Sequence, residues 1–71
     1  MINHKIIGSK IRTFRKQKKL SQYDLADLMF MDQGSISLIE RGKRTISAPS
    51  LFRFAEVLQV SVYDFGVWNN G

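Results

Sequence analysis

Apolar residues recur at helical spacing along most of the chain, with polar residues between them. In residues 6–18 the apolar positions lie three or four residues apart, and cations fill much of the space between them. These apolar positions are Ile7, Ile11 and Phe14. The pattern predicts an amphipathic helix over 6–18. Arg15 falls beside the apolar stripe on a helical wheel, so we expect it to be half-buried and to need a partner.

Two short helices with a very short connection are predicted next. Ser21 and Asp24 form the pattern of a capping box, which opens a helix with a small apolar face. That face consists of Leu25, Ala26 and Met29. Asp32 is a good N-cap for a helix over 33–41, and Gly42 follows its end at the C′ position. Only three residues separate the two helices, so they must meet at a steep angle, which makes them a helix-turn-helix candidate.

Two further capped helices complete the predicted fold. Ser47 and Pro49 provide the start of a fourth helix. Its expected apolar face is Leu51, Phe52, Phe54, Ala55 and Leu58. Ser61 and Asp64 repeat the Ser-x-x-acid start and open a short fifth helix that runs through Phe65. With no strand alternation of convincing length, the sequence predicts an all-α fold of five helices.

The length and composition favour one small domain. We expect the 71 residues to form a single domain over 1–71, with its core at about 6–66 and a tail at 67–71. The absence of Cys excludes disulfides and thiolate metal sites. No stretch approaches the roughly 18 apolar residues that cross a bilayer, and the start lacks the apolar run of a signal peptide. We therefore expect a soluble, cytoplasmic protein.

The positive charge is unevenly distributed. Eleven Lys and Arg against six Asp and Glu give a net charge of +5, which suits nucleic acid, an anionic membrane surface or an acidic protein. Seven of the cations precede Leu20, three lie within 41–44, and Arg53 stands alone. The first cluster is also typical of a solvated helix end favoured by the helix dipole. The role of the second cluster depends on what the helix before it presents.

The helix predicted over 33–41 has one polar and one apolar side. An arc of roughly 140° on a helical wheel contains Gln33, Gly34, Ser37, Leu38 and Arg41. Ser35, Ile36 and Ile39 take the other side. Gln can bind adenine, Ser can bond to base edges, and Leu can contact a thymine methyl in the major groove, although Gln and Ser are also ordinary solvent-facing residues. Lys43 and Arg44 follow where a phosphate backbone would run.

Three motifs with their spacing resemble one family of DNA-binding domains. They are SQxxLA at 21–26, ISxIERG at 36–42 and FAxxLxVS at 54–61. Together the chain resembles the phage repressor and Cro type of helix-turn-helix domain, the xenobiotic response element family, over about residues 7–65. The resemblance implies a compact five-helix lambda-repressor-like fold with the helix-turn-helix at helices two and three. It also implies a third helix in the major groove, and a homodimer on a palindromic operator of double-stranded DNA.

The resemblance also implies roles by position. The implied base-reading residues are Gln33, Gly34, Ser37 and Leu38. The implied phosphate-contacting residues are Gln22, Arg41, Lys43 and Arg44. The side chain of Gln22 is also expected to support the first reader. Arg15 and Glu40 match the family's partly buried ion pair between the first and third helices, which would give Arg15 its partner.

Three residues depart from the family pattern. Phe30 and Gln59 stand where glycines are usual, and a non-Gly residue at positive φ costs about 1 kcal/mol. We therefore expect the turn at Phe30 to be slightly recast. Gly34 holds a reading position without a side chain, so specificity there must come from the other readers, from water or from DNA shape.

The apolar residues at the C-terminal end have two interpretations. Phe65, Val67 and Trp68 either fold back to close a small core or form a dimer seam. Leu28 and Phe30 are also apolar at positions where the family tends to be polar or Gly. A symmetric dimer would place two third helices about 34 Å apart, one turn of DNA.

Other classes of function fit less well. The only His, His4, lies near the N-terminus, and no paired carboxylates or phosphate loop accompany it, so we expect no catalysis, metal or cofactor. Residues 6–18 are basic and amphipathic, but their apolar face is needed for the core rather than for a membrane. The sequence thus predicts a sequence-specific transcriptional regulator, a repressor. It leaves open an antitoxin-type protein-binding module on the same fold, or the DNA-binding head of a longer regulator.

Overall fold

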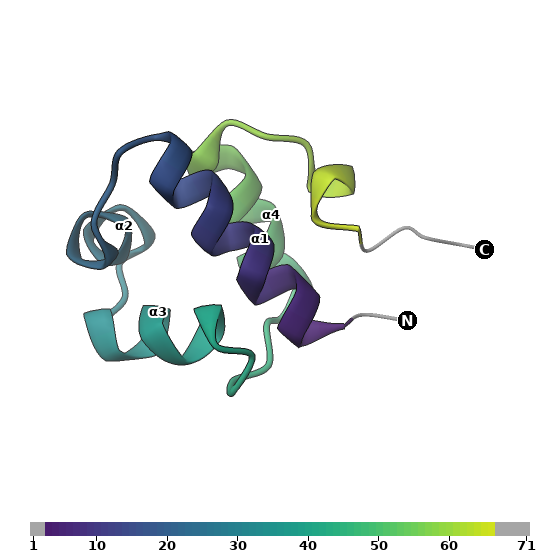
Figure 1. The fold of residues 1–71 in the computed structure, drawn as a ribbon, viewed down its shortest axis with the longest axis horizontal. Helices are drawn as coiled ribbons and strands as arrows, with labels where there is room; N and C mark the ends of the chain where they lie inside the picture. The colour runs from purple at the N-terminus through teal and green to yellow at the C-terminus, as the bar shows by residue number, and fades with distance from the viewer. Residues whose placement is uncertain (1–2, 67–71) are drawn as a thin grey trace.

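The computed structural model describes residues 3–66, which form four α-helices and a final 3-10 turn (Figure 1). The elements are α1 (His4–Gln17), α2 (Gln22–Met29), α3 (Gln33–Glu40), α4 (Ala48–Leu58) and η1 (Val62–Phe65). Residues 3–66 contain no strand, as predicted. The expected fifth helix is a 3-10 turn instead, because the Ser61 cap and Gly66 at φ 78° leave it only four residues.

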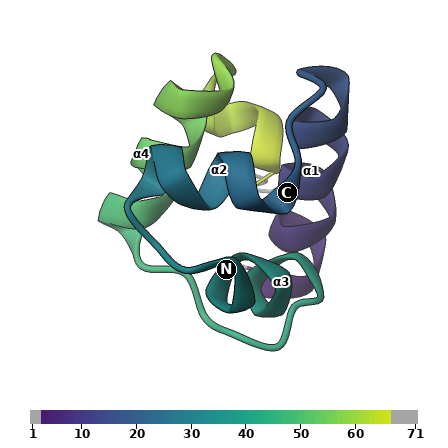
Figure 2. The same ribbon diagram turned by 90° about the vertical axis from the view of Figure 1, so that its left-hand side faces the viewer.

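The helices surround one core with α3 at its edge. α1 packs against α3, α4 and η1, and α2 packs against α3 and α4. In Figure 2, α2 lies across the view while α3 below it is seen nearly end-on, so the two cross steeply as predicted. The connection between them is residues 30–32, the length expected for a helix-turn-helix.

The core uses most of the predicted apolar positions, with one wrong assignment. Its buried members are Ile7, Ile11, Leu25, Ala26, Met29, Ile36, Ile39, Ile46, Leu51, Phe54, Ala55, Leu58 and Phe65. Phe52 was expected on the buried face of α4 but is 54% exposed. The buried positions of α4 form a stripe, and Phe52, one residue after Leu51, is turned away from it.

The helix starts follow their capping residues. α2 begins with a capping box of two hydrogen bonds, each 2.9 Å long. The backbone N–H of Asp24 donates to Ser21 Oγ, and the backbone N–H of Ser21 donates to Asp24 Oδ2. α1 begins two residues before the predicted start, because Asn3 Oδ1 accepts from the N–H groups of Lys5 and Ile6 at 3.1 and 3.0 Å. Asp32 occupies the N-cap of α3, but its side chain makes no capping hydrogen bond.

The turn after α2 keeps the left-handed conformation despite its bulky residue. Phe30 has φ 57°, and the Met31 N–H donates to the Ala26 carbonyl at 2.9 Å. The expectation of a recast turn was therefore wrong: Phe30 adopts the left-handed conformation itself, at a cost of about 1 kcal/mol. Gln59 after α4 does the same at φ 60°. The ring of Phe30 is 84% exposed, and the Arg53 guanidinium lies 4.9 Å from its centroid.

A direct backbone contact fixes α3 against α1. A Cβ built on Gly8 of α1 would lie 2.1 Å from the carbonyl oxygen of Ile39 in α3. Only glycine allows the two helices to approach this closely. The position of α3 relative to the core therefore depends on a contact without an intervening side chain.

Candidate nucleic-acid interface

The two sides of α3 have opposite surroundings, as the sequence predicted. Ile36, Ile39 and Glu40 are buried. On the other side Gly34 and Leu38 are exposed, whereas Gln33 and Ser37 are half-buried. The four expected base-reading residues therefore share one partly open face of the domain.

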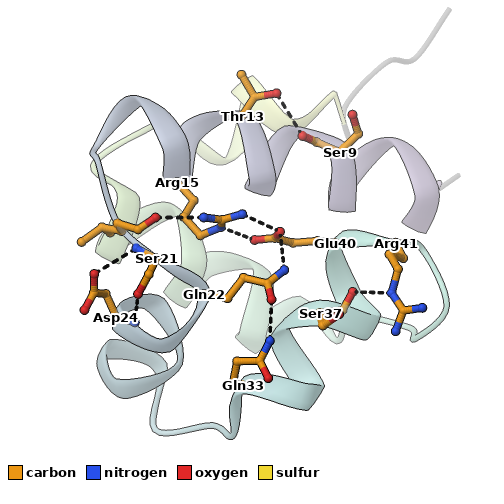
Figure 3. Close-up of polar contacts among 11 residues, drawn as sticks. Ser9, Thr13, Arg15, Ser21, Gln22, Asp24, Gln33, Ser37, Glu40 and Arg41 are labelled. Atoms are coloured by element: carbon orange, nitrogen blue, oxygen red, sulfur yellow. Dashed lines mark hydrogen bonds and ion pairs between the residues drawn. The ribbon is translucent and has the colours of Figure 1, made fainter.

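A buried ion pair anchors the C-terminal part of α3 to α1 (Figure 3). Arg15 Nε donates to Glu40 Oε2 at 2.6 Å, and its Nη2 donates to Oε1 at 3.0 Å. Its Nη1 donates to the Leu20 carbonyl at 2.9 Å. Arg15 is more deeply buried than expected, at 7% exposure. The fork-like geometry fixes both partners, since each of the three guanidinium nitrogens donates to an acceptor.

The ion pair continues as a chain of hydrogen bonds to the start of α3. Gln22 Nε2 donates to Glu40 Oε1 at 3.1 Å, and Gln33 Nε2 donates to Gln22 Oε1 at 2.5 Å. Figure 3 shows Arg15, Glu40, Gln22 and Gln33 in a continuous line from α1 to α3. A primary amide has two N–H donors and a carbonyl oxygen, so Gln33 retains groups that can bind a base edge. The side chain of Gln33 is thus positioned by the core.

A second polar chain lies at the opposite border of the same face. Arg44 Nη1 donates to Ser35 Oγ, and the Ser35 hydroxyl donates to Asp32 Oδ1. The Ser35 hydroxyl, and to a smaller degree the Arg44 charge, lowers the pKa of Asp32 from its ordinary 3.8. Sequence reasoning placed Ser35 on the packing side and did not link it to Arg44. The guanidinium of Arg44 lies against the first turn of α3.

The end of α3 and the loop after it are tightly defined. Gly42 has φ 71° at the predicted C′ position, and its N–H donates to the Ile39 carbonyl at 3.0 Å. The Lys43 N–H donates to the Leu38 carbonyl at 2.9 Å, which completes a Schellman motif. Arg41 is the C-cap, so α3 is one residue shorter than predicted. Its Nε donates to the Ser37 carbonyl at 3.3 Å (Figure 3).

His4 has a structural role that the sequence did not reveal. Its Nδ1 accepts a hydrogen bond of 3.1 Å from the backbone N–H of Ile46, 42 residues away. This contact ties the start of α1 to the loop that carries Lys43 and Arg44. The sequence signal was absent because neither residue belongs to a local motif.

Exposed positive side chains follow α3 and also lie along α1. Lys43 and Arg44 are exposed after α3, and Gln22 is half-buried at the start of α2. Four exposed cations lie in α1 and two follow its end: Lys5, Lys10, Arg12 and Lys16, then Lys18 and Lys19. Of these, Lys18 Nζ donates to Gln59 Oε1 at 2.7 Å. The first charge cluster is therefore largely solvated surface.

Of the three residues expected either in the core or in a dimer seam, only Phe65 lies among the described residues. Phe65 is fully buried, with its ring edge-on to Phe14 at a centroid distance of 5.5 Å. Of the two interpretations, this burial fits closure of the core rather than a dimer seam, because the ring packs between η1 and α1. Val67 and Trp68 lie outside the described residues.

Residues 3–66 contain neither a metal-binding cluster nor a membrane-spanning helix. No group of three or more His, Cys, Asp or Glu side chains in this range could hold a metal ion. In the same range, no helix has the length and apolar character needed to cross a membrane.

Fold and site together define a helix-turn-helix domain. Two short helices join through a three-residue turn, and the second presents a polar face beside a cationic loop. The family model described as helix-turn-helix, HTH_3, matches residues 11–65. The chain belongs to this family, the XRE-type domains of phage repressor and Cro-like regulators.

Several solved structures have the same fold. The restriction-modification controller protein C.AhdI from Aeromonas hydrophila is 30% identical, with a TM-score of 0.80 over 86% of this chain and 92% of that one. The clp gene regulator ClgR from C. glutamicum is 27% identical, with a TM-score of 0.86 over 94% of this chain and 87% of that one. SinR, a master regulator for biofilm formation solved in complex with DNA, is 33% identical, with a TM-score of 0.76 over 83% and 95%.

A search of curated proteins finds no match. The family and the structural neighbours support DNA-binding transcriptional regulation as the activity of this chain.

Proposed function

We propose that this protein is a sequence-specific transcriptional repressor that reads double-stranded DNA with α3 in the major groove. The observation that carries the proposal is the placement of Gln33. Hydrogen bonds through Gln22 connect its amide to the buried ion pair of Arg15 with Glu40. A reader that is held in place before binding loses less side-chain entropy when it meets a base.

The proposed contacts divide into base reading and phosphate binding. Gln33 would form a bidentate contact with adenine, Ser37 would bond to a base edge, and Leu38 would pack on a thymine methyl. Phosphates would be bound by Gln22, Arg41, Lys43 and Arg44, which lie near the two ends of α3. Occupation of a promoter by the bound domain would exclude RNA polymerase. The proposal is for a binding protein of the cytoplasm, without an enzymatic step.

We further propose that two copies bind a palindromic operator. Two-fold symmetry would place the α3 helices about 34 Å apart, so that both enter the major groove on one face of DNA. Sedimentation of the protein with a selected operator should show two chains per duplex. One chain on a single half-site would contradict the dimer.

A protein-binding role on the same fold is the second candidate. It is favoured by the exposure of Leu28, Phe30 and Phe52, at 48%, 84% and 54%. An antitoxin-type protein would bind a toxin through such side chains and its own promoter through α3. Isolation of a stoichiometric toxin complex that still binds the selected operator would support this role over a dedicated repressor.

Selection of binding sites from random duplex DNA tests the proposal directly. We expect a defined motif with strongly salt-dependent affinity, whereas weak binding without a motif would contradict sequence-specific regulation. Gln33→Ala should cost about 1–3 kcal/mol on the selected site and little on random DNA. As the matched control, Lys43→Ala should weaken both DNAs alike and reduce the salt slope by about one unit. Equal losses on both DNAs for Gln33→Ala would remove it from base reading.

A further inference from the structure

The second reading position of α3 has no side chain of its own, and a neighbouring carboxylate lies beside the empty space. A Cβ built on Gly34 would lie 3.3 Å from Oδ2 of Asp32. Gly34 is exposed and lies on the same face as Gln33, Ser37 and Leu38. The carboxylate of Asp32 therefore approaches the space that a side chain at position 34 would enter.

The side chain of Asp32 is also not used to cap the helix. It is the N-cap of α3, yet its side chain makes no capping hydrogen bond. By contrast, the N-cap of α2, Ser21, accepts from the N–H of Asp24 at 2.9 Å. The first residues of a recognition helix are those that approach base edges most closely, and Asp32 immediately precedes them.

The orientation of the carboxylate is set by its neighbours. Oδ1 accepts from the Ser35 hydroxyl, and Ser35 Oγ accepts from Arg44. Oδ2 is left on the side of Gly34. The Ser35 hydroxyl lowers the pKa of Asp32, so near neutral pH the carboxylate is ionised and can only accept hydrogen bonds.

We propose that Asp32 is a specificity-determining residue that accepts a hydrogen bond from the exocyclic amino group of a cytosine beside the base read by Gln33. The proposal rests on the proposed function, since it needs α3 in the major groove. Cytosine N4 is the usual donor to a carboxylate there, whereas guanine N7 and O6 and thymine O4 are acceptors. Adenine presents its amino group next to the acceptor N7, which repels a carboxylate.

Asp32→Asn tests the role of the carboxylate with almost no change of shape. Sites should be selected from random duplex DNA with the wild-type chain and with the variant. We expect the wild type to select cytosine at one position of the half-site. The variant should lose about tenfold of that preference at this position alone, while the preference due to Gln33 remains. Thermal melting of both proteins checks that the variant folds.

Gly34→Gln tests the shared location independently. A Gln side chain at position 34 should displace the carboxylate and replace cytosine by adenine at the same base pair. If cytosine stays selected and adenine appears at a different base pair, the two side chains do not share one position and the proposal is wrong.

The outcomes also separate this proposal from the proposed function. An unchanged motif for Asp32→Asn, with affinity raised equally on all DNAs, would mean that Asp32 only neutralises Arg44, and would overturn the proposal. A wild-type chain that selects no motif would contradict the proposed function itself. A wild-type motif without any cytosine preference would contradict only the role of Asp32.

Discussion

The two borders of the α3 face contain similar polar groups in very different surroundings. The inner border, formed by Arg15, Glu40, Gln22 and Gln33, begins at side chains that are 9% and 2% exposed. The outer border, formed by Asp32, Ser35 and Arg44, lies largely in solvent. Breaking one half of a buried pair is far more costly than breaking an exposed one. The inner border thus fixes where α3 points, whereas the outer border can change without loss of the fold.

The largest effect should come from the inner border. Glu40→Ala leaves the Arg15 guanidinium buried without its anion, so we expect a loss of about 3–5 kcal/mol in the free energy of unfolding. Urea unfolding followed by circular dichroism measures it. Asp32→Ala at the outer border is the matched removal of a carboxylate and should change stability far less. Similar losses for the two variants would remove the energetic distinction between the borders.

The second largest effect on stability should come from the close contact between α1 and α3 at Gly8. Gly8→Ala forces a Cβ into the Ile39 carbonyl, so α1 and α3 must separate, at a cost of about 1–3 kcal/mol. Gly34→Ala on the open face of α3 is the control, because its Cβ would meet only the exposed Asp32 carboxylate, 3.3 Å away. The melting temperature should therefore fall much more for Gly8→Ala than it changes for Gly34→Ala. A Gly8→Ala variant as stable as the wild type would show that the helix contact can relax.

The hydrogen-bonded link within the inner border should matter more for DNA than for folding. Gln22→Ala removes the side chain that joins Gln33 to Glu40, and it also removes a proposed phosphate contact. We expect about tenfold weaker binding to the selected site, with at most about 1 kcal/mol lost in stability. Fluorescence anisotropy with labelled duplex measures the binding. Full additivity of Gln22→Ala and Gln33→Ala would contradict the link, because coupled residues are not additive.

The smallest effect concerns acid sensitivity. The backbone N–H and hydroxyl of Ser21 lower the pKa of Asp24, and the Ser35 hydroxyl lowers that of Asp32, both from an ordinary 3.8. A lowered folded-state pKa contributes stability that is complete above 3.8 and is lost as the pH falls below it. Asp24→Asn and Asp32→Asn should each make the unfolding free energy less dependent on pH in that acidic range. Urea titrations at a series of pH values measure it, and an unchanged slope would contradict the linkage.

Local sequence signals predicted most of the fold. The Ser21 and Asp24 box, the Gly42 C′ position and the three-residue turn are chemical patterns within a few residues, and each appears as expected. Phe52 was misplaced because an apolar residue next to a buried stripe looks the same in sequence as one within it. Phe30 shows that packing between two helices can impose a conformation that local preference opposes.

The candidate site was less predictable because its contacts join distant residues. Resemblance to the family indicated the pairing of Arg15 with Glu40. It also indicated that Gln22 supports Gln33, but no sequence pattern could show that Gln22 bonds to Glu40 as well. The bond from Ile46 to His4 spans 42 residues and was missed. Asp32 was recognised as a cap, yet its carboxylate binds Ser35, a choice between two nearby donors that spacing cannot decide.

The close approach at Gly8 has a consequence for redesign of this domain. The backbone of α3 rests directly on α1, on the side away from the open residues 34 and 38. New side chains at those two positions can therefore be introduced without repacking the support beneath them. A library varied at 34 and 38 should yield folded proteins with altered DNA preferences, because the packing of α3 on α1 stays unchanged.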